Sequence, residues 1–230
     1  FGLAPAAIGS DTGGSVRIPA AWNDVIGLKT THGRLPMAGT VPLVESFDTI
    51  GPLTRTVEDA ALILAALGGT KPADLRGASL KGCRFMILET VALDQCREGP
   101  MKGFDQAVAR LKDAGAEIVR DTIPELAEAM SLSAIVFTSE AYAIWRDKIE
   151  AAPEKMYGPV RERFRSGADF NAADYVAGWR KVKTVRQVWN ERTAGFDAVL
   201  TPTAAILPPD AARLQSDPDY FAAENLLALR

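Results

Sequence analysis

Residues 7–20 read Ala-Ile-Gly-Ser-Asp-Thr-Gly-Gly-Ser-Val-Arg-Ile-Pro-Ala, and this stretch decides the fold. At its centre is one hydroxyl, that of Ser15, preceded by the paired glycines Gly13 and Gly14. Glycines let a backbone bend sharply and let other atoms come close. Successive N–H groups in such a turn can point into one concavity and hold an anion. A hydroxyl beside such a turn provides the two groups that acyl transfer needs, a nucleophile and an oxyanion hole.

The same stretch resembles the second half of the signature of the amidase signature family of serine hydrolases. That pattern is small-x-Gly-x-Asp-x-Gly-x-Ser-aliphatic-Arg-x-Pro-small, and so many constrained places in register are far more specific than a lone Gly-Gly-Ser. The places are filled by Ala7, Gly9, Asp11, Gly13, Ser15, Val16, Arg17, Pro19 and Ala20. The resemblance continues in Gly27–Lys29, Gly33-Arg34, Asp48–Pro52, Arg55–Asp59 and Thr201–Thr203.

The resemblance implies that Ser15 is the catalytic nucleophile of a Ser–cis-Ser–Lys triad that uses no histidine. In the family pattern the cis-serine lies about two dozen residues before the nucleophile, and the lysine lies further upstream. Both partners therefore fall before Phe1, outside this sequence. The resemblance also assigns the oxyanion hole to the backbone N–H groups of Thr12, Gly13, Gly14 and Ser15.

Two charged residues, Asp11 and Arg17, flank the nucleophile. A buried ion pair between them would fix one backbone arrangement of the loop, and contact with substrate is the alternative. We favour bracing because the two residues lie on opposite sides of a sharp loop. Thr201, Pro202 and Thr203 follow a predicted strand, where ligands of α/β folds gather. They are candidates for lining the acyl pocket, although a proline-marked strand exit explains them equally well.

Other reactive side chains lack a supporting pattern. His32 is the only histidine, so a Ser-His-Asp triad would have to use it, but its neighbours show no sign of a general base. Lys29 would have to be desolvated to act as a neutral base at about pH 7. Cys83 and Cys96 lie in no glycine turn, which is typical of buried or idle thiols. We expect no metal, because no cluster of histidines and cysteines has metal-site spacing, and no organic cofactor.

Composition excludes several other classes of protein. The 230 residues carry a formal net charge of −3 and a pI near 5.4, which argues against a dedicated nucleic-acid binder. Basic residues do gather between 161 and 186, as is typical of a solvated helix face. Charged residues interrupt every apolar run, so no membrane span is expected. The two cysteines fit a reduced, cytoplasmic location better than a disulfide scaffold.

Helix and strand signals alternate after the glycine-rich start. Thr56 is a predicted N-cap of a helix that ends at the glycine pair 68–69. This helix is apolar nearly all round, so we expect it to be buried. Residues 84–88 and 116–120 are predicted strands, and apolar residues at helical spacing between 101 and 115 predict the helix that joins them. Strand, helix and strand at this spacing form a βαβ unit with parallel pairing.

The second half of the chain is mostly helical from Ile123 to about residue 192, with Asn171 as a predicted N-cap. Phe196–Leu200 is another predicted strand, and Phe221–Leu229 is helix-like. Because the chain starts on Phe1 and ends within that run, we interpret it as an internal fragment of a longer protein. No linker divides it, so we expect part of a single amidase domain. Its segments are a nucleophile loop with following strands (1–55), an α/β segment (56–122), a mainly helical segment (123–195), and a strand with a substrate-side loop (196–230).

The resemblance implies the α/β amidase signature fold, a central twisted mixed β-sheet with helices on both faces, of which this chain covers about half. It also implies hydrolysis of a carbon–nitrogen acyl bond in a small-molecule amide, with aryl amides, carbamates and esters as further substrate classes. No nucleic-acid or membrane partner is expected, and a homodimer is left open. The alternative is the amidase-like A subunit of a tRNA-dependent glutamyl or aspartyl amidotransferase. A second alternative is a non-catalytic fragment or homologue.

Overall fold

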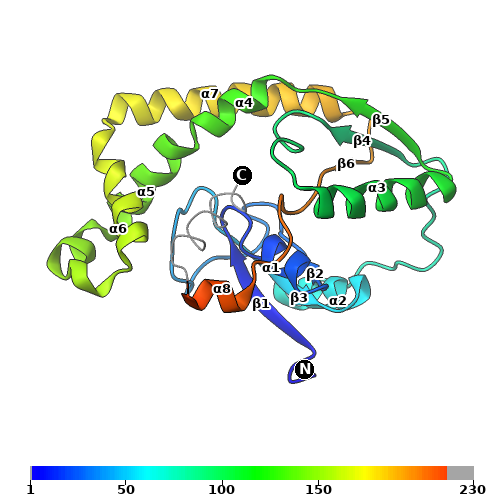
Figure 1. Cartoon of the computed structure of the whole chain (residues 1–230), viewed down its shortest axis with the longest axis horizontal. Coiled ribbons are helices and arrows are strands. Elements are labelled where there is room, and N and C mark those ends of the chain that lie inside the picture. Colours follow the sequence, from blue (N-terminus) through cyan, green and yellow to red (C-terminus); the bar gives the residue numbers. More distant parts are fainter. Residues whose placement is uncertain (1, 217–230) are drawn as a thin grey trace. The chain divides into compact units, whose positions relative to one another are not determined.

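A computed structural model describes residues 2–216 (Figure 1). Their contacts divide the chain into two compact units. The described part of the first unit comprises 2–38, 47–121 and 195–216, and the second unit comprises 39–46 and 122–194. The predicted helix-like run 221–229 lies outside the described residues.

The first unit contains an antiparallel sheet of three strands in the order β1-β3-β2. The strands are β1 (Ala6–Asp11), β2 (Ile26–Gly27) and β3 (Thr49–Thr54). β1 pairs with β3 from Ala6 opposite Thr54 to Asp11 opposite Thr49. This register places the start of β3 beside the end of β1, where residues 12–16, hereafter the Ser15 turn, begin.

A short helix, α1 (Arg17–Trp22), follows the Ser15 turn directly. The patterns of residues 1–55 predict loop and short strands, and this helix is not among the predictions. Pro19 is the third residue of this helix, and its ring lacks the N–H that would otherwise donate to the Ser15 carbonyl. The N–H of Ile18 donates to the carbonyl of Gly14 at 2.8 Å, so the helical hydrogen bonds already start inside the Ser15 turn. A helix this short, with glycines before it and a proline within it, leaves no periodic pattern to detect.

The second sheet of the first unit is parallel and contains the predicted βαβ unit. β4 (Arg84–Leu88), α3 (Glu98–Asp113) and β5 (Glu117–Asp121) follow one another, and α3 packs against β5 (Figure 1). β4 pairs in parallel with β5 on one side and with β6 (Ala198–Leu200) on the other. Residues 85–88 are buried, as is usual for the central strand of a parallel sheet. The predicted strands, helix and parallel pairing are therefore confirmed. α8 (Ala211–Ser216) ends the described chain.

The helix α2 (Val57–Gly68) begins and ends where the sequence predicts. Thr56 Oγ1 accepts the Asp59 N–H at 3.1 Å, and Gly69 closes the helix in the left-handed conformation. The prediction that α2 is buried all round is wrong: only Ala60 and Ala65 are buried, whereas Leu62 is 53% exposed. The helix packs against β3 along one side. Its apolar composition predicted burial on every side, but burial of the other side would need another element packed against it.

The second unit is helical, as predicted. Its helices are α4 (Glu125–Ser131), α5 (Ser133–Ala151), α6 (Gly158–Arg165) and α7 (Ala172–Thr193), with short 3₁₀ turns at Pro153–Lys155 and Ser166–Asp169. Asn171 caps α7 as expected, in a reciprocal capping box with Asp174. Several basic residues of this region form ion pairs: Arg165 with Glu150 and Glu162, Arg161 with Glu162, and Lys181 with Glu128.

Side chains of the second unit also hold the loop 39–46. The backbone N–H of Ser46 donates to Glu140 Oε2 at 3.1 Å, and Tyr175 Oη donates to Glu140 Oε1 at 2.7 Å. The indole N–H of Trp145 donates to the Pro42 carbonyl at 2.9 Å. These contacts explain why the loop 39–46, although distant from the helices in the sequence, belongs to the same compact unit.

The architecture is α/β, and both antiparallel and parallel strand pairing occur in its two three-stranded sheets. This confirms the predicted fold class. Across residues 2–216, no helix combines the length and the apolar character that crossing a bilayer requires.

Candidate active site

Ser15 lies in the turn between β1 and α1, and it is exposed. A nucleophile must reach the carbonyl carbon of its substrate, so exposure is the first requirement of the predicted role. The turn is anchored by neighbours on either side of this serine rather than by the serine itself.

The main anchor of the Ser15 turn is Asp11, the last residue of β1, which is 0% exposed. Its carboxylate accepts the backbone N–H groups of Gly14 at 2.8 Å, Val16 at 3.2 Å and Arg17 at 3.4 Å. The guanidinium of Arg17 adds two hydrogen bonds, from Nε at 3.0 Å and from Nη2 at 2.9 Å. The two charged residues that flank Ser15 in the sequence thus form an ion pair. Charge-assisted, two-pronged contacts of this kind fix geometry as well as adding energy.

The electrostatics of Asp11 follow from the same contacts. Burial by itself raises the pKa of this carboxyl, because it disfavours the charged form. The hydrogen bond and the charge of Arg17, joined by the N–H groups of Val16 and Gly14, act in the opposite direction and prevail. The pKa of Asp11 therefore lies below its ordinary value of 3.8, and the side chain is ionised at neutral pH despite its burial.

Gly14 allows the turn to close. Its φ of +130° is a conformation that other residues rarely adopt. A Cβ at this position would also lie 2.7 Å from Cδ1 of Ile18, so the end of that side chain would have to shift to admit a larger residue. Of the four N–H groups that the sequence resemblance assigns to an oxyanion hole, that of Gly14 already has an acceptor, because it donates to Asp11. Over the described chain, no acceptor binds the N–H of Gly13 or Ser15.

The start of β3 contacts the other end of the Ser15 turn. Thr12 Oγ1 donates to Oδ1 of Asp48 at 2.5 Å, and Thr49 Oγ1 donates to the carbonyl oxygen of Asp11 at 2.8 Å. Sequence reasoning assigned no role to Asp48 or Thr49. The available signal was their place in the run Asp48–Pro52, which carries part of the family resemblance.

Lys29 is half-buried near the same ion pair. Its Nζ donates to the Thr30 carbonyl at 2.7 Å. Burial lowers the pKa of this amine, the positive charge of Arg17 lowers it further, and Asp11 offsets part of the effect. Lys29 is therefore a local amine with a depressed pKa, which the sequence did not reveal.

The histidine and the cysteines show no catalytic arrangement. His32 is exposed on the loop after β2. Both thiols are free, and the Sγ of Cys83 donates to the Ser79 carbonyl at 3.4 Å. Burial raises the pKa of the Cys96 thiol, which makes it a poorer nucleophile.

The candidate pocket residues Thr201, Pro202 and Thr203 follow β6, with both threonines exposed and the proline half-buried. In residues 2–216, no hydrogen bond joins them to the Ser15 turn. The chain beyond them does reach α1, because the indole N–H of Trp22 donates to the carbonyl of Ile206 at 3.2 Å.

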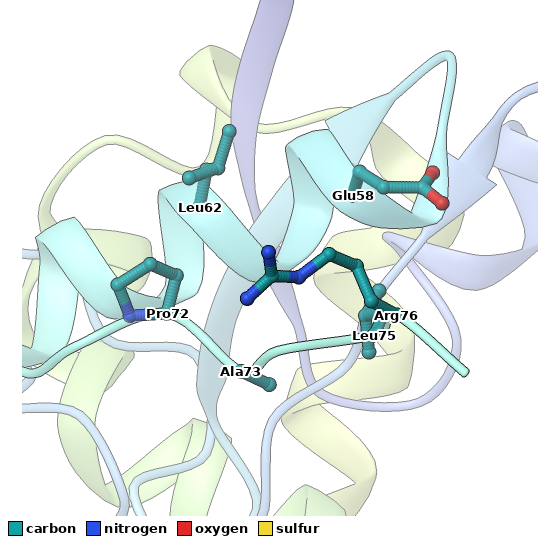
Figure 2. A pocket seen from close by; sticks show the side chains of 6 residues that line it. All are labelled: Glu58, Leu62, Pro72, Ala73, Leu75 and Arg76. Atoms are coloured by element: carbon teal, nitrogen blue, oxygen red, sulfur yellow. The ribbon is translucent and has the colours of Figure 1, made fainter. Parts of the chain in front are cut away.

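The structure also contains a hollow outside this region (Figure 2). Its volume is about 310 Å³, and it lies between α2 and the segment 72–76, lined by Glu58, Leu62, Pro72, Ala73, Leu75 and Arg76. None of these residues belongs to the Ser15 turn. Within the described chain, no group of three or more histidine, cysteine, aspartate or glutamate side chains is placed to hold a metal ion.

Fold and site together define an α/β protein that presents an exposed serine on a braced, glycine-rich turn. The chain belongs to the Amidase family, whose sequence model matches residues 1–229; this is the amidase signature family of the sequence resemblance. It is 35% identical to the 2-amino-5-chloromuconic acid deaminase of Comamonas testosteroni, over 100% of this chain and 50% of that protein. It is 33% identical to the A subunit of the glutamyl-tRNA(Gln) amidotransferase of Gloeobacter violaceus, over 87% of this chain and 49% of that protein.

Solved structures agree with the sequence relatives. The crystal structure of an amidase superposes with a TM-score of 0.81 at 28% identity, covering 90% of this chain and 46% of that chain. The chain thus spans about half the length of the curated relatives and solved structures that it matches.

Proposed function

We propose that this chain carries the nucleophile of an amidase-type hydrolase that cleaves the carbon–nitrogen acyl bond of a small-molecule amide. The observation that carries the proposal is the position of Ser15. It is exposed at the apex of a turn whose path is fixed by five hydrogen bonds to one buried carboxylate, that of Asp11. Membership of the Amidase family supports the same reaction class.

In the proposed reaction, Ser15 Oγ attacks the amide carbonyl and loses its proton as the C–O bond forms. The N–H groups of Thr12, Gly13 and Ser15 stabilise the negative charge on the carbonyl oxygen. Collapse of the tetrahedral intermediate breaks the C–N bond, the nitrogen leaves as the protonated amine, and an acyl-serine remains. Water then attacks the acyl-serine and releases the acid. By family resemblance, the Ser15 proton moves through a cis-serine to a neutral lysine, both outside this sequence, and the lysine returns it to the leaving nitrogen. In the second step the same base takes a proton from the attacking water and returns it to Ser15 Oγ as the acid leaves.

Asp11 and Arg17 serve the proposed reaction as braces rather than as substrate contacts. Both carboxylate oxygens of Asp11 are already occupied, and two of the guanidinium nitrogens of Arg17 point to them. Thr201, Pro202 and Thr203 remain candidates for the acyl pocket, because they lie at the carboxyl end of the parallel strand β6.

A second candidate function is that of the amidase-like A subunit of a tRNA-dependent amidotransferase. The observation that favours it is the 33% identity to the Gloeobacter violaceus protein over 87% of this chain. Glutaminase activity together with copurifying partner subunits would support this alternative, and hydrolysis of simple amides by the isolated protein would support the first proposal.

The decisive test is Ser15→Ala in the protein at its natural length. We expect amide hydrolysis to fall by at least about 10³-fold, as for other removed nucleophiles, and labelling by a serine-directed fluorophosphonate to disappear. The control is Ser133→Ala, because Ser133 is an exposed serine at the first position of α5 and alanine suits a helix. Unchanged turnover in Ser15→Ala would overturn the proposal.

A further inference from the structure

The Ser15 turn has a second anchor, at the start of β3, which the proposed reaction has not used. Asp11 holds the later part of the turn, from Gly14 onward. The earlier part is held by two further hydrogen bonds. The Thr12 hydroxyl donates to the Asp48 carboxylate, and the Thr49 hydroxyl donates to the Asp11 carbonyl. Asp48 and Thr49, where β3 begins, thus contact Thr12 and Asp11, where β1 ends and the Ser15 turn begins.

Both of these residues are buried: Asp48 is 5% exposed and Thr49 is 2% exposed. A buried carboxylate or hydroxyl is costly unless it is hydrogen-bonded, so these side chains favour the one turn geometry that satisfies them. The bond between Thr12 and Asp48 is short, at 2.5 Å, and such a bond to a carboxylate is stronger than one between neutral groups.

We propose that Asp48 and Thr49 are positioning residues that align the Ser15 turn for attack on the substrate carbonyl. The inference rests on the proposed function, because it assumes that the N–H groups of the turn receive the oxyanion. The Thr12 side chain, held by Asp48, fixes the direction of the Thr12 peptide group. The Thr49 hydroxyl fixes the Asp11 carbonyl, which belongs to the peptide that joins Asp11 to Thr12. The turn is therefore held on both sides of its N–H groups.

The expected signature is a loss of kcat with KM little changed. Asp48 and Thr49 are buried and act on the turn, and donor misalignment matters most when charge develops in the transition state. A displacement of about 1 Å can lower a rate by up to about 10²-fold, so we expect Thr49→Val and Thr12→Val each to lower kcat by about 10- to 100-fold. Thr12→Ser keeps the hydroxyl and should restore most of the activity.

The strand β3 offers a matched control for Thr49. Thr54, at its other end, is equally buried (2% exposed), and its Oγ1 also donates to a backbone carbonyl, that of Thr56, at 2.8 Å. Thr54→Val therefore removes the same kind of bond far along the strand from the Ser15 turn. We expect Thr54→Val and Thr49→Val to lower the melting temperature similarly, but only Thr49→Val to lower kcat.

The experiment measures kcat, KM and melting temperature for these variants in the protein at its natural length, beside Ser15→Ala. Equal loss of kcat in Thr54→Val would show that general destabilisation is the cause and would overturn the inference. Folded Thr12→Val and Thr49→Val proteins with wild-type kcat would also overturn it. If Thr49→Val does not fold, the half-buried Thr12 still gives the answer through Thr12→Val and its Thr12→Ser rescue. Failure of the proposed function itself looks different, because Ser15→Ala would then retain wild-type turnover.

Discussion

At the scale of single residues, the site depends on a carboxylate that does no chemistry. Asp11 is fully buried, and its five donors come from one continuous segment of chain, residues 14–17. Each donor bond depends on the same turn path, so the carboxylate selects one backbone arrangement out of many. The backbone on which the exposed Ser15 lies is therefore held by a neighbouring side chain, which favours a defined direction for a residue on a loop.

The ion pair between Arg17 and Asp11 gives a stability prediction. Arg17→Ala leaves a buried carboxylate without its cation, and we expect a loss of about 2 kcal/mol in the free energy of unfolding. The loss is smaller than for a wholly buried pair, because the Arg17 side chain is 44% exposed and the backbone donors remain. Urea unfolding measures the change.

The control for that measurement is Arg76→Ala, since Arg76 also forms a two-pronged ion pair, with Asp74, but both side chains are mostly exposed. The midpoint for Arg76→Ala should match that of the wild type. A fully stable Arg17→Ala protein with a raised KM would instead indicate that Arg17 contacts the substrate.

The lowered pKa of Asp11 predicts a pH dependence of stability. Its folded pKa lies below the ordinary value of 3.8, so the unfolded state takes up its proton first as the pH falls. The stability that the ionised carboxylate contributes is complete above 3.8 and is lost as the pH falls through the folded pKa. Unfolding free energies from about pH 6 to about pH 2 should show this loss in the wild type and a shallower slope in Asp11→Asn. Identical slopes in the two proteins would contradict the assignment.

At the scale of elements, helices and strands with local signals could be predicted and those held by distant contacts could not. The strand 84–88 and the cap at Asn171 follow from short-range patterns, and both lie where predicted. The helix α1 has no such pattern. The anchor at Asp48 and Thr49 depends on the pairing of β1 with β3, which brings together residues 36 to 38 positions apart. The sequence pattern therefore singled out the segment around Ser15 as the candidate site. The contacts of Asp48 and Thr49 with that segment follow only from the register of β1 and β3, which the sequence pattern does not give.

The cap of α7 can be tested at this scale. Asn171 Oδ1 accepts the N–H groups of Ala173 at 2.8 Å and Asp174 at 3.1 Å. Asn171→Ala leaves both donors without this acceptor, and we expect it to lower the free energy of unfolding by about 1–2 kcal/mol. Asn171→Ser can still cap the helix, so it should recover most of the loss in denaturant unfolding. Equal destabilisation by both substitutions would indicate that Asn171 acts through other contacts.

At the scale of the whole molecule, the proposal places the nucleophile in this chain, and family resemblance implies a base outside the sequence. The chain spans about half the length of the deaminase, the amidotransferase protein and the amidase that it matches. In the proposed reaction, family resemblance assigns the proton of Ser15 to a cis-serine and a lysine that are not among the residues of this sequence. One local competitor is present, because Lys29 is half-buried with a lowered pKa near Arg17 and Asp11. The pH dependence of kcat/KM distinguishes Lys29 from a base that lies outside this sequence.

A lysine base must be neutral to accept a proton, so the kcat/KM of the natural-length protein should rise toward alkaline pH and level off above the pKa of that lysine. If the base lies outside this sequence, Lys29→Gln should keep the rising limb at the same pH, even if its rate is lower throughout. Loss of that limb in Lys29→Gln would assign the base to Lys29 instead. An optimum below about pH 6 in the wild type would contradict any lysine base and would point to a carboxylate, because only a group with an acidic pKa is deprotonated there.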